Sequence, residues 1–189
     1  SDLWQTAMDE EFKSLLENQT WDLVECPPGV KPVPMKWVYK IKRNADGSVE
    51  RFKARLVAKG FLQKQGVDFE EVYAPVSKQT TVRALLAVCA EKDLELEQLD
   101  VKTAFLNGHL EEEIYMQQAQ GYEEGEKSVV CKLKRAIYGL RQAPRAWYLR
   151  LKEEMEKLGW PVSGADPALF IRREDGGVFY ALVYVDDIL

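Results

Sequence analysis

An adjacent pair of aspartates, Asp186 and Asp187, interrupts an apolar stretch of the sequence and constrains the fold more than any other feature. Residues 179–185 before the pair and 188–189 after it carry no charge. Two neighbouring carboxylates between apolar segments are unfavourable unless a solvent-exposed turn or a divalent cation compensates their charge. The pair therefore predicts either a tight, exposed turn between two strands or a metal site.

A third aspartate, Asp100, has similar surroundings, because leucines precede it and apolar residues follow it. If the fold brings Asp100 beside Asp186, the carboxylates make a credible Mg²⁺ site, since Mg²⁺ prefers carboxylate oxygens, water and substrate phosphates. Two metal ions about 3.5–4 Å apart can activate an attacking 3′ oxygen and stabilise a leaving pyrophosphate oxygen. Other acidic runs, such as 111–113 and 153–154, are interpreted as solvated faces.

Composition excludes several classes of protein and site. The 189 residues are 46% hydrophobic and 30% charged, which is ordinary for a globular chain with a sizeable core. No run of about 18 apolar residues occurs, so we expect no membrane span. Three widely spaced cysteines and a single histidine argue against a disulfide framework, a zinc site or a serine triad. The first residues lack the order of a secretory signal, so we expect an intracellular protein.

Charge is unevenly distributed along the chain, whose net charge is −5. Nine basic and two acidic residues lie between Lys36 and Lys64, and seven basic residues with no acid lie between Lys132 and Lys152. Because electrostatic screening is short-ranged, charged surfaces act locally. The separation therefore predicts two basic surfaces on an acidic body, and a nucleic-acid partner is compatible with the negative net charge.

Two strand-like runs, 36–43 and 48–58, flank Asn44-Ala45-Asp46-Gly47, a turn signal that predicts a β-hairpin. The alternation of the second run places three cations on one face, namely Arg51, Lys53 and Arg55. Its opposite face is apolar and is expected to pack. The row of cations is interpreted either as a binding surface for an anionic partner or as a solvated strand face, and the pattern alone favours neither.

The remaining segments predict helices packed against further strands. Helical periodicity covers residues 3–17, 80–92 and 143–158, the last ended by Gly159 and Pro161. The expected inward side chains of the second helix are Val82, Leu85, Leu86 and Cys89. The other expected elements are a strand over 95–101, a short helix from Thr103, and a second hairpin from 168–173 and 178–185. Helices packed on an antiparallel or mixed sheet make an α+β fold.

Five blocks of sequence, in this order, resemble successive blocks of the reverse transcriptases of copia-type (Ty1/copia) LTR retrotransposons. These blocks are Lys36–Lys42, Arg51–Phe61, Leu99–Gly108, Leu133–Trp147 and Tyr184–Leu189. The resemblance covers the chain from about Trp4 to its last residue. Five blocks in the right order are far more specific than any one of them.

The resemblance implies a right-hand polymerase with fingers and palm, in which an antiparallel palm sheet is packed by helices. It implies a partial reverse transcriptase domain over 1–189: an N-terminal helix and connector (1–35), a fingers-like region (36–93), and a palm with an interleaved fingers-like segment (94–189). The sequence stops two residues past Asp187. We therefore expect a domain truncated after the Tyr184-Val185-Asp186-Asp187 turn, without the thumb, the RNase H region and the other parts of the Pol polyprotein.

The family resemblance also implies RNA-directed DNA polymerisation with two Mg²⁺ ions, for which Mn²⁺ can substitute. By analogy Asp100 and Asp186 are metal ligands and Asp187 is an auxiliary ligand. Four residues are expected to bind the incoming nucleotide: Lys53 and Arg55 at its triphosphate, Phe105 against the ribose 2′-hydroxyl, and Gln142 in its pocket. Without the analogy, Phe105 is interpreted as a plain core residue.

The expected partners are an RNA or DNA template with its primer and a deoxynucleoside triphosphate, with no membrane involved. The residues expected to contact nucleic acid are Tyr184 near the primer end and Lys134, Arg135, Arg141 and Arg145 along the template–primer backbone. The expected location is a cytoplasmic virus-like particle of the parent element. Two alternatives remain: a truncated, non-catalytic nucleic-acid-binding remnant of such an element, and an unrelated α+β interaction module.

Overall fold

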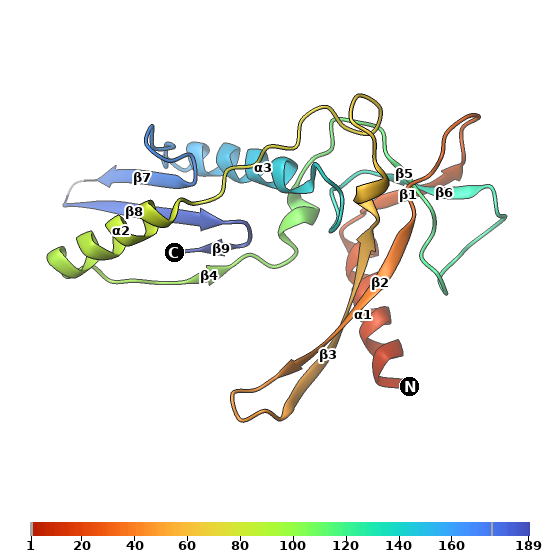
Figure 1. Cartoon of the computed structure of the whole chain (residues 1–189), viewed down its shortest axis with the longest axis horizontal. Coiled ribbons are helices and arrows are strands. Elements are labelled where there is room, and N and C mark those ends of the chain that lie inside the picture. The colour runs from red at the N-terminus through yellow and green to blue at the C-terminus, as the bar shows by residue number, and fades with distance from the viewer. Residues whose placement is uncertain (1, 175) are drawn as a thin grey trace. The chain divides into compact units, whose positions relative to one another are not determined.

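The chain forms two units, and each unit combines two separate stretches of sequence. The computed structural model describes residues 2–174 and 176–189. Unit 1 holds the chain up to Val72 together with His109–Ala143, and unit 2 holds Tyr73–Gly108 together with Pro144–Leu189. The elements drawn in Figure 1 are, in chain order, α1 (Asp2–Glu17), β1 (Trp21–Glu25), β2 (Met35–Arg43), β3 (Val49–Ala58), η1 (Gly60–Leu62), α2 (Gln79–Lys92), β4 (Leu99–Asp100), η2 (Ala104–Asn107), β5 (Tyr115–Met116), β6 (Val129–Leu133), α3 (Ala143–Lys157), β7 (Leu169–Glu174), β8 (Gly177–Tyr184) and β9 (Asp187–Ile188).

In unit 1 the predicted first hairpin is confirmed. β2 and β3 pair antiparallel around the Asn44–Gly47 turn, where Gly47 has a φ of 85° that favours glycine. Ala54, Leu56 and Ala58 are buried and alternate with the basic positions of β3, as expected. The apolar face packs on α1, where the ring of Trp4 meets those of Tyr39 and Phe52 edge-on.

A second sheet in unit 1 was not predicted from the sequence. It has the strand order β1-β6-β5, and β1 pairs antiparallel with β6 although more than a hundred residues separate them. Met116, Val130, Cys131 and Leu133 of this sheet are buried. The strands are short, so their periodicity gave no signal, and the pairing depends on contacts distant in sequence.

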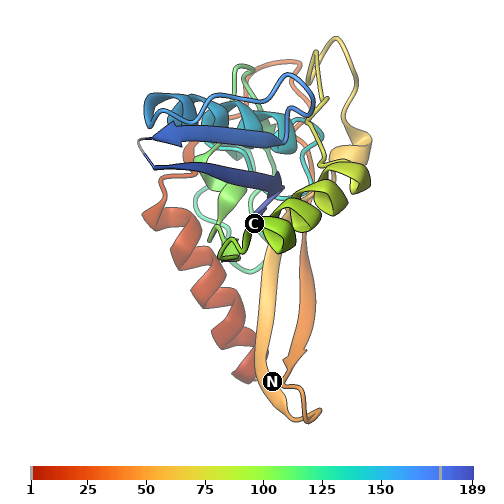
Figure 2. The same cartoon turned by 90° about the vertical axis from the view of Figure 1, so that its left-hand side faces the viewer.

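Unit 2 is a four-stranded antiparallel sheet of order β4-β9-β8-β7 with helices on its faces. Trp147 and Leu151 of α3 pack with Phe170 of β7 and with two residues of β8, Ala181 and Val183. The intervening residue of β8, Leu182, packs instead with Leu85 and Cys89 of α2. Because side chains alternate along a strand, α2 and α3 cover opposite faces of β8, and Figure 2 shows the two helices on either side of it. The structure thus confirms a mixed α/β fold with antiparallel sheets.

Several sequence predictions about unit 2 need correction. The strand expected over 95–101 is reduced to the two residues of β4, because its partner β9 offers only two residues for pairing. Leu86 of α2, expected to point inward, is 42% exposed. The helix 143–158 and the hairpin of β7 and β8 are confirmed within one or two residues.

The two units divide the chain differently from the ranges expected for fingers and palm. α2, expected with the fingers-like region, belongs to unit 2, and 109–143, within the range expected for the palm with an interleaved fingers-like segment, belongs to unit 1. The names fingers and palm for these units stay predictions. No helix in the described part of the chain has the length and apolar character needed to cross a bilayer.

A buried carboxylate, Asp166, joins the start of α2 to the start of β7. Its side chain is 1% exposed and accepts hydrogen bonds from the Lys78 amide (3.1 Å), the Thr81 hydroxyl (2.6 Å) and the Ala168 amide (2.9 Å). Burial opposes ionisation of Asp166, but the bonds from Thr81, Ala168 and Lys78 outweigh it and hold the pKa of its carboxyl below the ordinary value. Lys78, the N-cap residue of α2, makes no side-chain cap of its own, so Asp166 serves as the cap from a distant loop.

We predict that Asp166→Asn lowers the free energy of unfolding by about 2 kcal/mol, because an amide presents a donor where the site supplies only donors. The lowered pKa means that the stabilisation by Asp166 is present above the pKa of an unfolded aspartate, about 4, and is lost as pH falls through the folded value. Urea denaturation at pH 7 and at pH 3 measures both effects. Asp93→Asn, at the exposed end of the same helix, is the control and should change little; an equal loss there would contradict the assignment.

Candidate functional site

The three aspartates singled out from the sequence meet at one end of the sheet in unit 2. β8 and β9 are joined by a tight turn in which Tyr184 pairs with Asp187 and only Val185 and Asp186 intervene. On the other side of β9, Asp100 of β4 pairs with Asp187. The amide of Val101 donates a 2.8 Å hydrogen bond to the carbonyl of Asp186. The predicted tight turn is confirmed, and the direct strand partner of Asp100 is Asp187 rather than Asp186.

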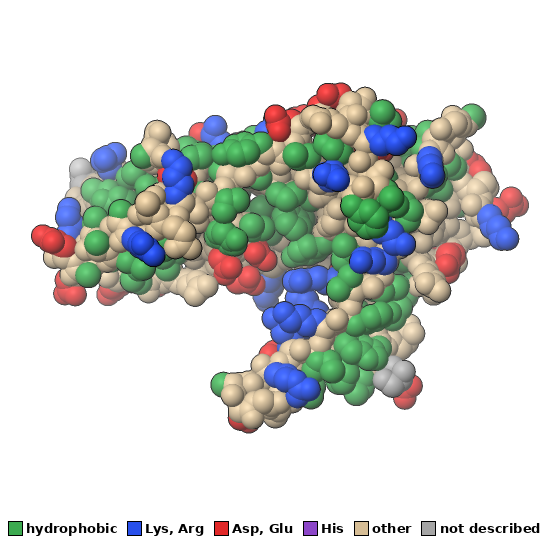
Figure 3. All heavy atoms as spheres, viewed as in Figure 1, with side chains coloured by type: hydrophobic (Ala, Val, Ile, Leu, Met, Phe, Trp, Pro, Cys, Tyr) green, Lys and Arg blue, Asp and Glu red, His purple; other side chains and the backbone are tan. Residues whose placement is uncertain are grey.

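Negative charge accumulates at this turn without compensation by basic side chains. Asp100 is exposed and Asp186 and Asp187 are half-buried. Gln98 donates a 3.2 Å hydrogen bond to the Asp187 carboxylate, and no Lys or Arg of the described residues lies within ion-pair distance of any of the three. Figure 3 shows acidic side chains (red) gathered where β4 and β9 lie in Figure 1. An uncompensated, all-oxygen donor set is the kind that Mg²⁺ prefers.

The side chains are nevertheless not assembled as a metal centre. Within residues 2–174 and 176–189, no three His, Cys, Asp or Glu side chains converge in an arrangement that could hold a metal ion. The backbone therefore brings the three aspartates to neighbouring positions, while the three-ligand set inferred from the sequence stays a prediction.

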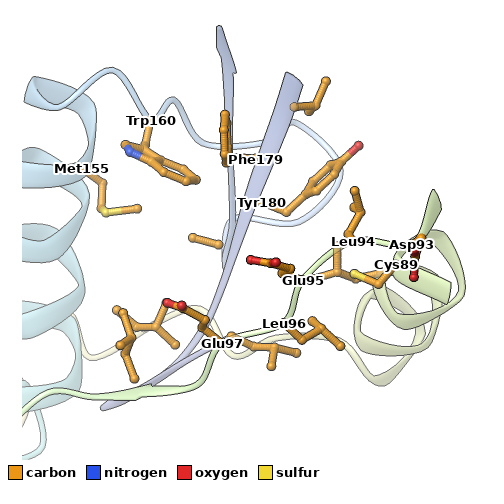
Figure 4. Close-up of a pocket in the computed structure, with 16 residues that line it drawn as sticks. Cys89, Asp93, Leu94, Glu95, Leu96, Glu97, Met155, Trp160, Phe179 and Tyr180 are labelled. Atoms are coloured by element: carbon orange, nitrogen blue, oxygen red, sulfur yellow. The ribbon is translucent and has the colours of Figure 1, made fainter. Parts of the chain in front are cut away.

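A hollow of about 710 Å³ in unit 2 has none of the three aspartates in its lining. It is lined mainly by apolar residues, and Figure 4 shows Met155 and Trp160 on one side of it and Cys89, Leu94 and Leu96 on the other. Leu99 and Ile188, which pair with each other and line the hollow, alternate with Asp100 and Asp187 along β4 and β9. The lining also includes Cys89 of α2 and Met155 of α3, which lie on opposite sides of β8, so the hollow is not confined to one face of the sheet.

The basic residues predicted on the first hairpin form one face of it in unit 1. The strand register places Lys53 opposite Lys40 and Arg51 opposite Lys42. With Lys36 and Arg55, these residues make a six-cation surface, which we call the basic face of the β2–β3 hairpin. Figure 3 shows Lys and Arg side chains (blue) gathered along this hairpin. The shared face predicted for Arg51, Lys53 and Arg55 is confirmed.

Positive charge on the basic face is only partly neutralised. Partial burial and then repulsion by Arg55, Arg51 and Lys42 lower the pKa of Lys53, and Glu11 offsets only part of this. Glu11 itself accepts a 3.2 Å hydrogen bond from the Leu56 amide. The Arg55 guanidinium lies over the Tyr138 ring, 4.6 Å from its centroid, which fixes its plane. A fixed group of mutually repelling cations favours binding of an anion.

Gln142, predicted to line the nucleotide pocket, is buried in unit 1 and holds two loops together. Its amide accepts a 3.1 Å hydrogen bond from Gln63 and donates a 2.9 Å bond to the Asp68 carbonyl. The Gly60 backbone approaches that of Gly139 so closely that a Cβ on Gly60 would lie 2.0 Å from the Gly139 carbonyl oxygen. A nucleotide contact by Gln142 stays a prediction.

The residues predicted to follow the template–primer backbone are partly engaged within the protein. Lys134 pairs with Asp22 at 2.9 Å, and the Arg141 side chain donates a 3.1 Å bond to the Gly60 carbonyl. Arg135 lies 3.3 Å from the Nδ1 atom of His109. The fourth residue, Arg145, belongs to unit 2, whereas the other three belong to unit 1. Their role in binding nucleic acid stays a prediction.

Two aromatic residues of unit 2, Tyr184 and Phe105, were predicted to be site residues, and their roles stay predictions. Tyr184 is 55% exposed directly before the aspartate turn. Phe105 is half-buried in η2, five residues after Asp100, and packs against the α3 cluster. Trp147 was missed by the sequence analysis: its indole N–H donates a 2.7 Å hydrogen bond to the Val185 carbonyl. Because Trp147 lies on the buried face of α3, the sequence pattern indicated only a core residue.

Comparison with known proteins identifies relatives of this chain. A family model described as reverse transcriptase (RNA-dependent DNA polymerase) matches residues 18–189. The chain is 49% identical over 185 residues to the retrovirus-related Pol polyprotein from transposon TNT 1-94 of Nicotiana tabacum, covering 97% of this chain and 14% of that protein. It is 45% and 44% identical to the Pol polyproteins from transposons RE2 and RE1 of Arabidopsis thaliana, covering 100% and 98% of this chain. The chain spans only 13–14% of the length of these relatives.

We predict that Lys53→Gln raises the free energy of unfolding by about 0.5 kcal/mol, because it removes a partly buried cation that Arg55, Arg51 and Lys42 repel and that lies opposite Lys40 in the register. The lowered pKa of Lys53 leads to the same expectation, because it means that the charge on Lys53 destabilises the fold at neutral pH. This destabilisation is relieved as pH rises through the pKa of Lys53 in the folded state. The same change should weaken binding of tripolyphosphate. Urea denaturation and calorimetric titration measure the two effects.

Lys13→Gln is the matched control for this prediction, since Lys13 is an exposed cation of α1 paired with Glu17. It should leave phosphate binding unchanged. A loss of stability in Lys53→Gln, or equal loss of phosphate binding in both variants, would show that the basic face is an ordinary solvated strand.

Proposed function

The chain belongs to the reverse transcriptase family of copia-type transposon Pol polyproteins, and we propose that its aspartate turn and basic face serve RNA-directed DNA polymerisation. In this reaction the 3′-hydroxyl of a primer attacks a deoxynucleoside triphosphate on an RNA or DNA template. The observation that carries the proposal is that the backbone places Asp100 of β4, Asp187 of β9 and Asp186 of the β8–β9 turn at neighbouring positions, with no Lys or Arg of the described residues within ion-pair distance.

In the proposed site, Asp100 and Asp186 would hold two Mg²⁺ ions and Asp187 would assist them. The ions, when bound, supply activation of the attacking oxygen and neutralisation of charge on the leaving pyrophosphate. The contribution of the chain is to position groups and neutralise charge, so no acid–base side chain is required of it. This matches a sequence with one histidine, which lies outside unit 2.

The basic face is proposed to bind phosphates. Arg55, whose guanidinium is oriented by Tyr138, suits bidentate contacts with phosphate oxygens, and Lys53 supplies a point charge. Tyr184 is proposed to lie near the primer end, and Lys134, Arg135, Arg141 and Arg145 to contact the template–primer backbone. In this proposal unit 2 is the palm and unit 1 contributes the fingers.

A non-catalytic function in nucleic-acid binding is the second candidate. It is favoured by one observation: the carboxylates are not assembled as a metal centre in the described residues, whereas the basic face is formed. Such a protein would bind a primed template with strong dependence on salt, because released counterions dominate the affinity, and metal ions would be irrelevant to it.

Primer extension distinguishes the two candidates. On an oligo-dT/poly-rA duplex with Mg²⁺ or Mn²⁺ we expect incorporation that falls roughly a thousandfold in Asp186→Asn, on the scale of losing a key electrostatic group. Asp93→Asn, an exposed aspartate of unit 2, is the control and should keep full activity. Binding of the duplex is measured in parallel by fluorescence anisotropy at several salt concentrations.

Each outcome of this experiment has a distinct meaning. Incorporation that only Asp186→Asn abolishes supports polymerisation. Salt-sensitive duplex binding without incorporation supports the non-catalytic candidate. Absence of both incorporation and duplex binding contradicts both candidates for this chain.

Phe105→Val tests the proposed selection of the sugar. If the Phe105 ring crowds a ribose 2′-hydroxyl, its removal should raise incorporation of ribonucleotides relative to deoxynucleotides about tenfold or more, the scale of a steric contact in a pocket. The ratio of the two incorporation rates is the measurement. An unchanged ratio with intact deoxynucleotide incorporation would assign Phe105 to the core alone.

A further inference from the structure

The turn that carries Asp186 has a strained backbone. Val185, its first central residue, has a φ of 57°, in the left-handed region. A β-branched side chain is unfavourable there, at a cost of order 1–3 kcal/mol, so the surrounding structure must hold it. The turn therefore depends on contacts outside itself.

Hydrogen bonds to the backbone carbonyls on either side of the Asp186 Cα fix the direction of the Asp186 side chain. The carbonyl of Val185 accepts a 2.7 Å bond from the Trp147 indole N–H, and the carbonyl of Asp186 accepts a 2.8 Å bond from the Val101 amide. These two carbonyls belong to the peptide planes on either side of the Asp186 Cα. Because peptide units are planar, orienting both planes sets the direction in which the Asp186 side chain leaves the backbone.

Trp147 is itself held rigidly. It is 6% exposed and packs in the core cluster with Ala104, Phe170 and Val183. The Gly108 backbone lies against that of α3, so a Cβ on Gly108 would be 2.8 Å from the Trp147 amide nitrogen. Trp147 thus contacts both the segment that follows Asp100 and the turn that carries Asp186.

The bond between Trp147 and the turn is partly buried and lies beside apolar residues. A small cavity of about 50 Å³ is lined by Val185 and Trp147 together with Tyr148, Leu151 and Val183. A hydrogen bond in such surroundings is stronger than one in water, and its loss leaves a carbonyl unpaired.

We propose that Trp147 is a positioning residue for Asp186, acting through its indole N–H on the Val185 carbonyl. Loss of the N–H frees the peptide plane before Asp186, lets the strained turn relax, and misplaces the Asp186 carboxylate relative to Asp100. The proposal rests on the proposed function for the role of the carboxylates. The effect of the Trp147 hydrogen bond on the turn can be measured independently of catalysis.

The test compares Trp147→Phe with Trp160→Phe in the full chain. Both changes replace an indole by a phenyl ring in unit 2, and Trp160 packs against the same core cluster. The first readout is hydrogen exchange of the Val101 amide, which donates to Asp186, with the Leu182 amide, which donates to Leu189 at 2.9 Å, as internal reference. The second readout is binding of Mn²⁺ alone, followed by the signal of the free ion.

In Trp147→Phe we expect Val101 to exchange about tenfold faster relative to Leu182 and Mn²⁺ to bind about tenfold more weakly, the scale of one buried hydrogen bond. Trp160→Phe should leave both unchanged. Replacing Trp147 by benzothienylalanine, which keeps the bicyclic ring but lacks the N–H, should reproduce the loss seen with phenylalanine.

Three results would overturn the proposal: unchanged Val101 exchange in Trp147→Phe, an equal effect of Trp160→Phe, or normal behaviour of the benzothienylalanine variant. If Mn²⁺ does not bind to the unaltered chain but Val101 exchange responds only to loss of the Trp147 N–H, the role of Trp147 in holding the turn is supported. The proposed metal site then fails. If the unaltered chain binds Mn²⁺ and extends primers but Trp147→Phe changes nothing, only the role of Trp147 fails.

Discussion

The pairing of β9 with β4 on one side and β8 on the other is the interaction on which the site depends. β9 has only two residues, and one of them is Asp187. Through this strand Asp100, more than eighty residues earlier in the chain, becomes a neighbour of the turn that holds Asp186. The hydrogen bonds of the sheet place the three aspartates at neighbouring backbone positions, and the same pairing satisfies the backbone groups of these strands.

So short a strand cannot hold its geometry alone, and the packing of α3 supplies the support. Trp147 and Leu151 pack against β8 beneath the turn, while α2 covers the other face of the same strand. The left-handed backbone of Val185 persists because its carbonyl has a donor in Trp147. Strain in this turn is thus compensated by the core beside it.

Charge is arranged oppositely in the two units. In unit 1, like charges face one another across the β2–β3 hairpin, and partial burial together with repulsion by Arg55, Arg51 and Lys42 lowers the pKa of Lys53. In unit 2, three carboxylates lack a basic partner among the described residues. Uncompensated like charges favour ligands of the opposite sign, which is why we propose phosphates for the basic face and Mg²⁺ for the aspartates.

Local signals in the sequence determined the elements that residues close in sequence can form. The period-two pattern of residues 48–58 and the Asn44–Gly47 turn specified the first hairpin and its basic face, and the apolar run broken by Asp186 and Asp187 specified the tight turn. The family, too, could be recognised from the sequence, because it is carried by ordered blocks of residues. Tertiary structure alone decided the β1-β6-β5 sheet, the shortening of β4, the burial of Gln142 and the bond from Trp147 to Val185. These features join residues distant along the chain, and periodicity cannot report them because it describes only which face of an element is apolar and not what covers that face.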